Sequence, residues 1–343
     1  MNQILMKRLG TENSRLQKKA NLKSCSVPDN MRTECSGKII KAHTISKCLG
    51  LSDLAIDGRV LGLPQKPNLF EYHKNGGKLE ILEMGVNEAS VLQCFCAKHD
   101  REIFSPIENE DFIASPEQCF LLAYRALINE WYKSVQVDLA DVLSEKMKQK
   151  SNEAFHQFIC DEIPDYVQET EWKKRDLNHD KDIFDDILIN KNFSKIKHYI
   201  FMGNRSSDMV CSFTLNPDIS FENKEIQNYN SPDYLASVYV NGISCKGNSY
   251  VIFSWIDNDY TNKVINNFFG GLRSKDNDTI ENDIFEFIIK NSENNFFSIK
   301  WYESLNRTQT KYLDAWVQPL SNRKLNNMNH KIRFMGLQEH YLL

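Results

Sequence analysis

The sequence lacks the long apolar segments that membrane insertion and secretion require. Its 343 residues include no run of about 18 apolar positions, the length at which a segment is taken as a membrane-spanning helix. Residues 1–24 are polar and basic and lack the apolar core of a signal peptide. We therefore expect a cytoplasmic protein that does not associate with a membrane.

The motifs of several common enzyme classes are also missing. The sequence has no Walker phosphate-binding loop, no dinucleotide-binding glycine pattern, no Gly-x-Ser-x-Gly turn and no His-Glu-x-x-His helix. These absences argue against a P-loop nucleotide hydrolase, a dinucleotide-dependent oxidoreductase, an α/β-hydrolase and a zinc protease of the helical type. Hydrophobic residues make up 41% and charged residues 26%, a composition typical of globular proteins.

The net charge of −4 is distributed unevenly. Residues 1–50 hold ten Lys and Arg against three Asp and Glu, whereas residues 151–195 hold eleven Asp and Glu against six Lys and Arg. A basic N-terminal block of this kind can contact the phosphates of DNA or RNA. A solvated basic arm without a nucleic-acid partner has the same composition, so both interpretations stay open.

Cysteine is abundant, with nine residues. An odd number of thiols in a chain without a secretory signal argues against a disulfide framework and favours a metal or redox site. Five lie in the first hundred residues, and the other four have apolar neighbours typical of buried core positions: Cys119, Cys160, Cys211 and Cys245.

Two pairs among the early residues have the chemistry of a structural zinc site, which takes four thiolate or imidazole ligands in a tetrahedron. Cys96 and His99 are separated by two residues, so both can face one ion. Cys25 and Cys35 are the expected second pair, but nine residues lie between them. This gap exceeds the usual spacing of about two to four residues, so the loop that contains Pro28 has to bulge outwards.

Alternative ligands remain open at this point. Cys94 can replace Cys96 if the latter turns towards the core, and Cys48 is a less favoured substitute. Residues 24–36 are rich in polar side chains and offer few apolar neighbours among which a thiol could be buried. The sequence therefore favours a metal ligand over a core thiol at Cys25 and Cys35.

Residues 25–104 also resemble a known enzyme family. The cysteine pair, the strand that ends in "AHTIS", a second strand and the segment "NEAS…FCAKHD" are similar to the HNH (ββα-metal) endonucleases built on a zinc-bound treble clef. Over most of its length the chain resembles a group of bacterial proteins that share "CSGKI…AHT" and "FC..HD" motifs. That second resemblance implies no particular activity.

The HNH resemblance implies a role for three residues. His43, at the end of the predicted strand, corresponds to the general base that activates water, and Asn87 to the asparagine that positions it. Asp100 corresponds to the helix residue that binds a catalytic Mg²⁺ or Mn²⁺. Two other interpretations stay open: Asn87 can be a helix N-cap, and His43 can be a further zinc ligand or a buried histidine bonded to a backbone carbonyl.

Hydrophobic periodicity changes along the chain. Apolar residues recur at helical spacing most clearly over residues 115–135, where Ser115, Pro116 and Gln118 form a helix-start signature. From residue 195 the period changes to two, which predicts strands, with a hairpin turn at 246–248. The expected strands are 38–45, 58–63 and a hairpin over 67–85 with its turn at 75–77; the expected helices are 87–104, 115–135, 137–163, 260–272, 279–292 and 298–317.

These patterns predict an α+β protein in three parts: a zinc-bound treble-clef or HNH-like module (1–110), a helical region (111–194), and a mostly antiparallel β domain with terminal helices (195–343). The function expected first is a metal-dependent nuclease acting on DNA or RNA, such as a bacterial anti-phage defence or toxin-type effector. The alternative is a non-enzymatic protein in which structural zinc scaffolds a surface that binds nucleic acid or a protein partner.

Overall fold

The structure is a computed structural model, and it describes residues 24–63, 75, 78–136, 153–229, 231–318 and 332–343; for 136 and 153–170 only the backbone is described. Within these ranges the predicted α+β class is confirmed. No helix in the described ranges is both long and apolar enough to cross a membrane.

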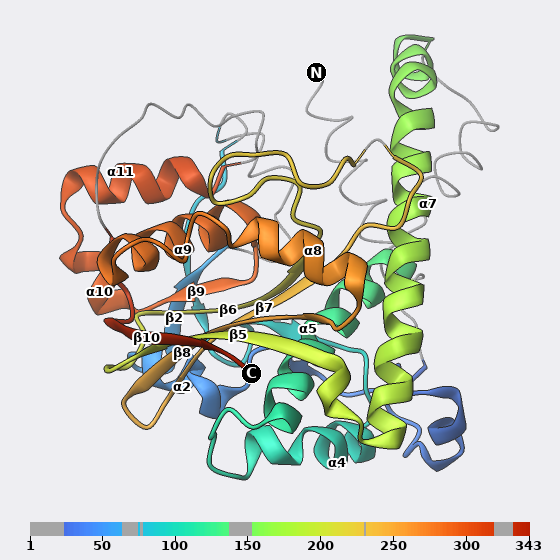
Figure 1. Cartoon of the computed structure of the whole chain (residues 1–343), viewed down its shortest axis with the longest axis horizontal. Coiled ribbons are helices and arrows are strands. Elements are labelled where there is room, and N and C mark those ends of the chain that lie inside the picture. The colour runs from blue at the N-terminus through green and yellow to red at the C-terminus, as the bar shows by residue number, and fades with distance from the viewer. Residues whose placement is uncertain (1–23, 64–74, 76–77, 137–152, 230, 319–331) are drawn as a thin grey trace.

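An eight-stranded antiparallel sheet forms the centre of the molecule (Figure 1), in the order β10-β5-β8-β7-β6-β9-β2-β3. The long central strands come from the region predicted to be rich in strands, and residues 245 and 248 pair across the predicted hairpin turn. The strands are β2 (Arg59–Gly62), β3 (Leu82–Gly85), β5 (Ile196–Gly203), β6 (Met209–Leu215), β7 (Val238–Cys245), β8 (Asn248–Ile256), β9 (Asn295–Phe297) and β10 (Leu337–Leu342).

Helices cover both faces of the sheet (Figure 1). One face packs against α4 (Ala97–Glu108), α5 (Pro116–Gln136) and α7 (Glu153–Asn190). The opposite face packs against α8 (Asp259–Phe268), α9 (Asn277–Asn291), α10 (Ile299–Ser304) and α11 (Arg307–Trp316). Shorter elements complete the chain: α2 (Leu51–Leu54), the 3₁₀ helices η1 (Asp29–Glu34), η2 (Lys47–Leu49) and η3 (Phe193–Lys195), and a separate pair of strands, β1 (Ala42–His43) and β4 (Val91–Leu92).

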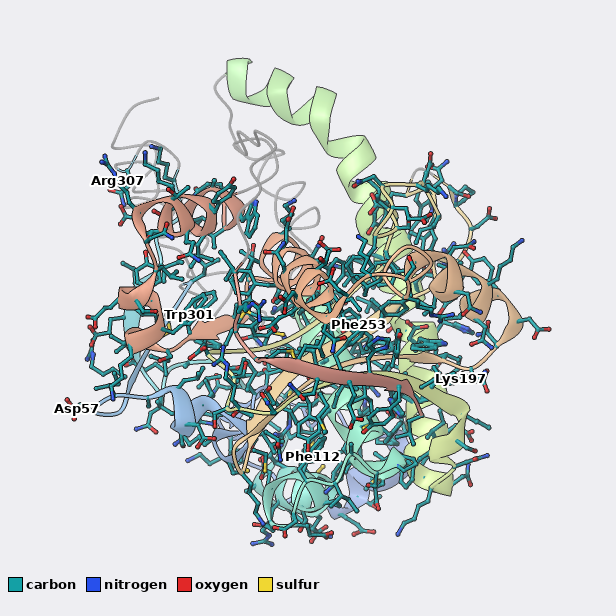
Figure 2. The ribbon with its side chains drawn as sticks, turned by 60° about the vertical axis from the view of Figure 1, so that its left-hand side comes forward. Asp57, Phe112, Lys197, Phe253, Trp301 and Arg307 are labelled. Carbon is teal, nitrogen blue, oxygen red and sulfur yellow. The ribbon has the colours of Figure 1, made fainter. Side chains whose placement is uncertain are left out.

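The two-sided cover explains why the central strands are apolar almost throughout. Side chains alternate between the two faces of a strand, and in β7 Tyr239 lies in the core beneath α5 while Val240 lies in the core beneath α8 and α9. In β8, Ile252 lies in the core beneath α5 and Phe253 lies in the core beneath α8 and α9. Figure 2 shows Phe253 inside the molecule and Arg307 at its periphery. Each strand therefore needs apolar residues on both faces.

The helix predicted over residues 115–135 is confirmed as α5, together with its capping box. The Gln118 backbone N–H donates to Ser115 Oγ (3.2 Å), and the Ser115 backbone N–H donates to Gln118 Oε1 (3.4 Å). The helical spacing predicts one buried stripe at Phe120, Tyr124, Leu127 and Trp131; the first three are fully buried, whereas Trp131 is only partly buried. This helix packs against β5, β6, β7 and β8 and is the main support of that face.

The start predicted for the helix over 87–104, at Asn87, is wrong. Residues 86–90 form turns, β4 follows, and the helix α4 begins at Ala97 with Cys96 as its N-cap. The reason is that the backbone just before Cys96 is engaged with an earlier segment: Ser26 N–H donates to Cys94 O (2.8 Å) and Ile40 N–H donates to Phe95 O (3.0 Å). These bonds hold the segment extended until Cys96.

The sheet runs across the predicted domain boundaries. Strand β2, from the first 110 residues, pairs with β9 through Leu61↔Phe297 and Gly62↔Phe296. The three-part division itself is not tested by this pairing and stays a prediction. Of the predicted hairpin over 67–85, the strand β3 is present and pairs with β2. Three other predictions lie outside the described residues: most of the hairpin turn, the first part of the helix predicted over 137–163, and the side chain of Cys160.

A buried carboxylate fixes α7 against the sheet. Asp180 is completely buried and accepts three hydroxyl hydrogen bonds, from Tyr234 (2.6 Å), Ser237 (2.6 Å) and Tyr239 (2.7 Å). Burial, which disfavours the charged form, raises the pKa of Asp180, and the three hydroxyl donors oppose that shift. The network is stable only while every member has its partner.

We expect Asp180→Ala to lower the free energy of unfolding by about 3 kcal/mol, because it leaves three buried hydroxyl groups without their acceptor. Urea denaturation monitored by circular dichroism measures this change. Asp182→Ala is the matched control, since Asp182 lies on the same helix and is exposed; its effect should stay within about 0.5 kcal/mol. Equal effects of the two substitutions would contradict the proposed role of Asp180.

Candidate metal centre

The centre is built on the small antiparallel pair β1–β4. The strands pair through Ala42↔Leu92 and His43↔Val91, and an isolated bridge joins Ile39 to Cys96. This pairing carries the chain that follows Cys35 alongside the chain that leads into α4. The loop from the first predicted ligand pair is thereby placed beside the second pair.

The four predicted zinc ligands converge. The ligand atoms of Cys25, Cys35, Cys96 and His99 all lie within 4.8 Å of one another. The His99 Nδ1 atom is 3.6 Å from Cys25 Sγ, 3.5 Å from Cys35 Sγ and 3.3 Å from Cys96 Sγ. Three sulfur atoms therefore surround one imidazole nitrogen, which is the donor set of a tetrahedral metal site.

Local structure explains how each ligand reaches the centre. Cys96 is the N-cap of α4, and His99 lies three residues on, where the helical spacing returns its side chain to the same face. Between Cys25 and Cys35 the chain forms η1, whose N-cap is Pro28. The bulge predicted from the nine-residue gap is thus confirmed. The alternative ligands Cys94 and Cys48 do not belong to the cluster. Cys94 is buried and Cys48 is exposed.

The electrostatics of the cluster favour a bound cation. Burial raises the pKa of the Cys25 thiol to about 12, because a thiolate there loses its hydration. Burial also raises the pKa of Cys96, but hydrogen bonds from the His99 backbone and from Ser36 outweigh it and bring the value down to about 6. A metal ion supplies the positive charge that buried thiolates require. The residues present therefore fit a metal ion such as zinc.

Within the part of the chain that the structure describes, this is the one group of three or more Cys, His, Asp or Glu side chains whose ligand atoms converge. The second site that the HNH resemblance implies, for Mg²⁺ or Mn²⁺, has no such converging group among those residues. The structure thus provides a place for one metal ion and leaves the second an expectation.

His43 lies on β1, half-buried, with a defined hydrogen bond. Its Nε2 atom is 3.1 Å from the backbone oxygen of Val86. Because a carbonyl oxygen only accepts, Nε2 carries the proton and Nδ1 keeps its lone pair. Burial lowers the pKa of His43 and the cations of Lys47 and Arg125 lower it further, which outweighs the opposing effects of the Val86 hydrogen bond and of Glu108. His43 does not belong to the four-residue cluster.

Asn87 and Asp100 lie in different settings. Asn87 is exposed, and its Oδ1 accepts a hydrogen bond from Lys47 Nζ (2.6 Å). Asp100 is on the first turn of α4, largely buried, with its Oδ1 atom 3.7 Å from Arg125 Nη2. No contact in the described structure joins either residue to His43, so their grouping with it stays a prediction.

Two charged residues near His43, Arg125 and Glu108, were not among the site residues predicted from the sequence. Arg125 on α5 is almost fully buried; its guanidinium lies 3.9 Å from the centre of the Phe104 ring and donates from Nη2 to Glu108 Oε1 (2.8 Å). Its Nε and Nη1 atoms have no hydrogen-bond partner among the described residues. A buried arginine inside an apolar helical stripe was the signal, since such a residue needs a partner.

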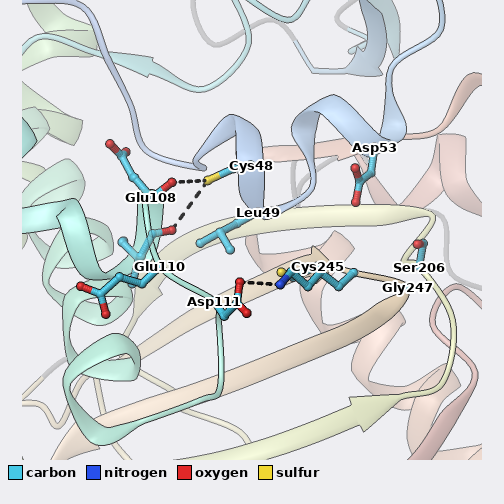
Figure 3. A pocket seen from close by; sticks show the side chains of 11 residues that line it. Cys48, Leu49, Asp53, Glu108, Glu110, Asp111, Ser206, Cys245 and Gly247 are labelled. Atoms are coloured by element: carbon cyan, nitrogen blue, oxygen red, sulfur yellow. Dashed lines mark hydrogen bonds and ion pairs between the residues drawn. The ribbon is translucent and has the colours of Figure 1, made fainter.

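Glu108 also lines a cavity of about 640 Å³. Figure 3 shows Asp53, Glu110 and Asp111 around the same space, with Cys48 beside the end of α4 and Cys245 on the far side. The one lysine of the lining, Lys246, is paired with Asp111. The side of the module beyond Glu108 is therefore acidic and does not suit a polyanion.

Comparison with protein-family models, with curated proteins and with solved structures finds no match. The resemblance to HNH endonucleases accordingly rests on the motifs alone, and the function has to be argued from the site.

We expect the purified protein to contain about one equivalent of bound metal ion per chain, because four ligand atoms already converge. Elemental analysis measures this value. Cys96→Ser should lose the metal and lower the melting temperature by several degrees, whereas Cys48→Ser should retain it, because Cys48 lies outside the cluster. The assignment would be contradicted if purified wild type contained no metal ion and its melting temperature equalled that of Cys96→Ser.

Proposed function

We propose that this protein is a zinc-stabilised nuclease acting on DNA or RNA, in which His43 is the general base. The observation that carries the proposal is the hydrogen bond from His43 Nε2–H to Val86 O. That bond fixes the neutral imidazole in the form whose Nδ1 can accept a proton. The treble-clef identity of the β1–β4–α4 unit is part of the same proposal.

The proposed role of the zinc is structural. Three thiolates and one imidazole fill all four positions of a tetrahedral ion, so no position is left for water or substrate. Such closed sites stabilise a fold, while catalytic zinc sites retain an open position. In this protein the ion would join the η1 loop to the start of α4 and thereby hold β1, and His43 with it, in place.

The proposed chemistry needs a base that is neutral near pH 7. Burial of His43 lowers its pKa from the ordinary value, so the unprotonated form prevails at neutral pH. Nδ1 takes a proton from water as the water oxygen forms a bond to phosphorus, and the bond from phosphorus to the leaving oxygen breaks.

Exposed cations near the centre support contact with a phosphate backbone. Lys38 and Lys41 lie on the segment between Cys35 and His43, and Arg101 lies near the start of α4; all three are exposed. None forms an ion pair with another described residue, whereas Lys98 pairs with Glu34. Exposed cations without ion-pair partners are suited to neutralising phosphates.

We assign no ligand set to the Mg²⁺ or Mn²⁺ expected for the reaction. Asp100 and Glu108, the carboxylates on α4 nearest Arg125, are both directed to its guanidinium. A divalent ion would have to compete with that cation for either carboxylate.

The non-enzymatic alternative is favoured by one observation. Lys47 occupies the Oδ1 atom of Asn87, the residue expected to position the water, and an intact catalytic pair would leave that atom free. In this alternative the same exposed cations bind nucleic acid, or the module binds a protein partner, and His43 only secures the turn at Val86.

We expect His43→Ala to reduce Mg²⁺- or Mn²⁺-dependent cleavage of plasmid DNA or of RNA by about 100-fold or more, the usual range for loss of a general base. His179→Ala is the matched control, because His179 is exposed on α7. With wild type, the rate should rise with pH and reach half its maximum below pH 6.5, since the lowered pKa moves protonation of His43 to more acidic values.

Equal cleavage by wild type and His43→Ala, or no cleavage of either nucleic acid by metal-loaded wild type, would exclude the nuclease proposal. Salt-sensitive binding of DNA or RNA without cleavage would instead select the alternative. Metal content should be unchanged in His43→Ala, which separates loss of the base from loss of the fold.

A further inference from the structure

A second cavity, away from the metal centre, lies between α7 and the chain that connects β6 to β7. It has a volume of about 350 Å³ and is lined by aromatic and acidic side chains, among them Trp172, Asp176, Tyr229 and Asp233. This size is at the lower end of the range found for small-molecule sites, about 300–1,000 Å³. None of these residues has a part in the proposed nuclease.

Hydrogen bonds hold the walls of the cavity in place. The Asn216 side-chain amide donates to Leu235 O (3.0 Å) and Ala236 O (3.3 Å), and Tyr229 donates its hydroxyl to Asn216 O. Arg175 donates to Pro232 O (2.6 Å). Because these bonds fix the loop without a ligand, little ordering would be needed on binding.

The cations around the cavity are already paired. Lys173 Nζ is 2.6 Å from Glu130 Oε1, and Arg175 Nη2 is 2.6 Å from Asp176 Oδ1. The Asp233 carboxylate accepts a hydrogen bond from Ser231 (2.7 Å) but forms no ion pair with any cation in the described ranges. One negative charge at the cavity is therefore left without a cationic partner.

The aromatic walls add to this preference. With its hydroxyl engaged by a backbone oxygen, Tyr229 presents its ring as the remaining surface, and Trp172 is partly exposed beside it. Aromatic rings attract cations electrostatically, and tryptophan does so most strongly. A carboxylate and two aromatic rings together select a ligand that is both positively charged and partly apolar.

We propose that this cavity binds a small organic cation, namely an amine, amidine or guanidine that carries an apolar ring or chain. The charged group would lie at Asp233 and the apolar part against Trp172 and Tyr229. This is a ligand-binding activity separate from the proposed nuclease and independent of its outcome.

The test compares benzamidine with benzamide, which has nearly the same shape but no charge, by isothermal titration calorimetry on the full chain. Wild type should bind benzamidine at least about tenfold more tightly than benzamide, because only benzamidine carries a positive charge that the Asp233 carboxylate and the two aromatic rings attract. Asp233→Asn should reduce that preference to about threefold or less. Trp172→Ala should weaken benzamidine binding about tenfold.

Two controls keep the result interpretable. Asp53→Asn alters the larger acidic cavity and should leave benzamidine binding unchanged. Trp172→Phe retains an aromatic wall and should recover most of the affinity lost in Trp172→Ala. This comparison separates loss of the aromatic contact from unfolding of the variant. Equal affinity for the two probes, no binding of benzamidine up to about 10 mM, or loss of binding in Asp53→Asn rather than Asp233→Asn would overturn the proposal.

Discussion

The convergence of three thiols and one imidazole is the constraint on which the N-terminal part of the structure depends. Strands β1 and β4 have two residues each, and η1 has no buried side chain. Elements of this size bury too little apolar surface to be stable alone. The ligand atoms within 4.8 Å of one another supply the missing link, provided that a cation compensates their charge and burial.

From this cluster the order extends into the main fold. Cys96 and His99 lie at the start of α4, and two carboxylates on α4 reach the buried Arg125 of α5. Because α5 packs directly on the central sheet, the metal centre is connected to the sheet through α4 and α5. His43 lies on β1, a strand whose position depends on the ligands that precede and follow it.

The sequence was informative where a short local pattern determines the structure. Cys96-x-x-His99 and the Ser115–Gln118 capping box are set by spacing alone, and both are present as expected. It was uninformative where distant backbone groups decide. The start of α4 depends on pairing between residues near 26 and 95, and the tautomer of His43 depends on Val86 O. Neither a two-residue strand pair nor a contact with a backbone carbonyl requires particular residue types, so the sequence does not predict them. The pairing of β2 with β9 joins segments over 200 residues apart, which local patterns do not predict either.

X-ray absorption at the zinc edge tests the central claim most directly, because it reports the ligands of the bound ion. Protein loaded with one equivalent of zinc should show three sulfur neighbours at about 2.3 Å and one nitrogen at about 2.0–2.1 Å, and Cys25→Ser should reduce the sulfur count to two. A first shell of oxygen and nitrogen atoms, or a sulfur count that Cys25→Ser leaves unchanged, would contradict a centre formed by Cys25, Cys35, Cys96 and His99.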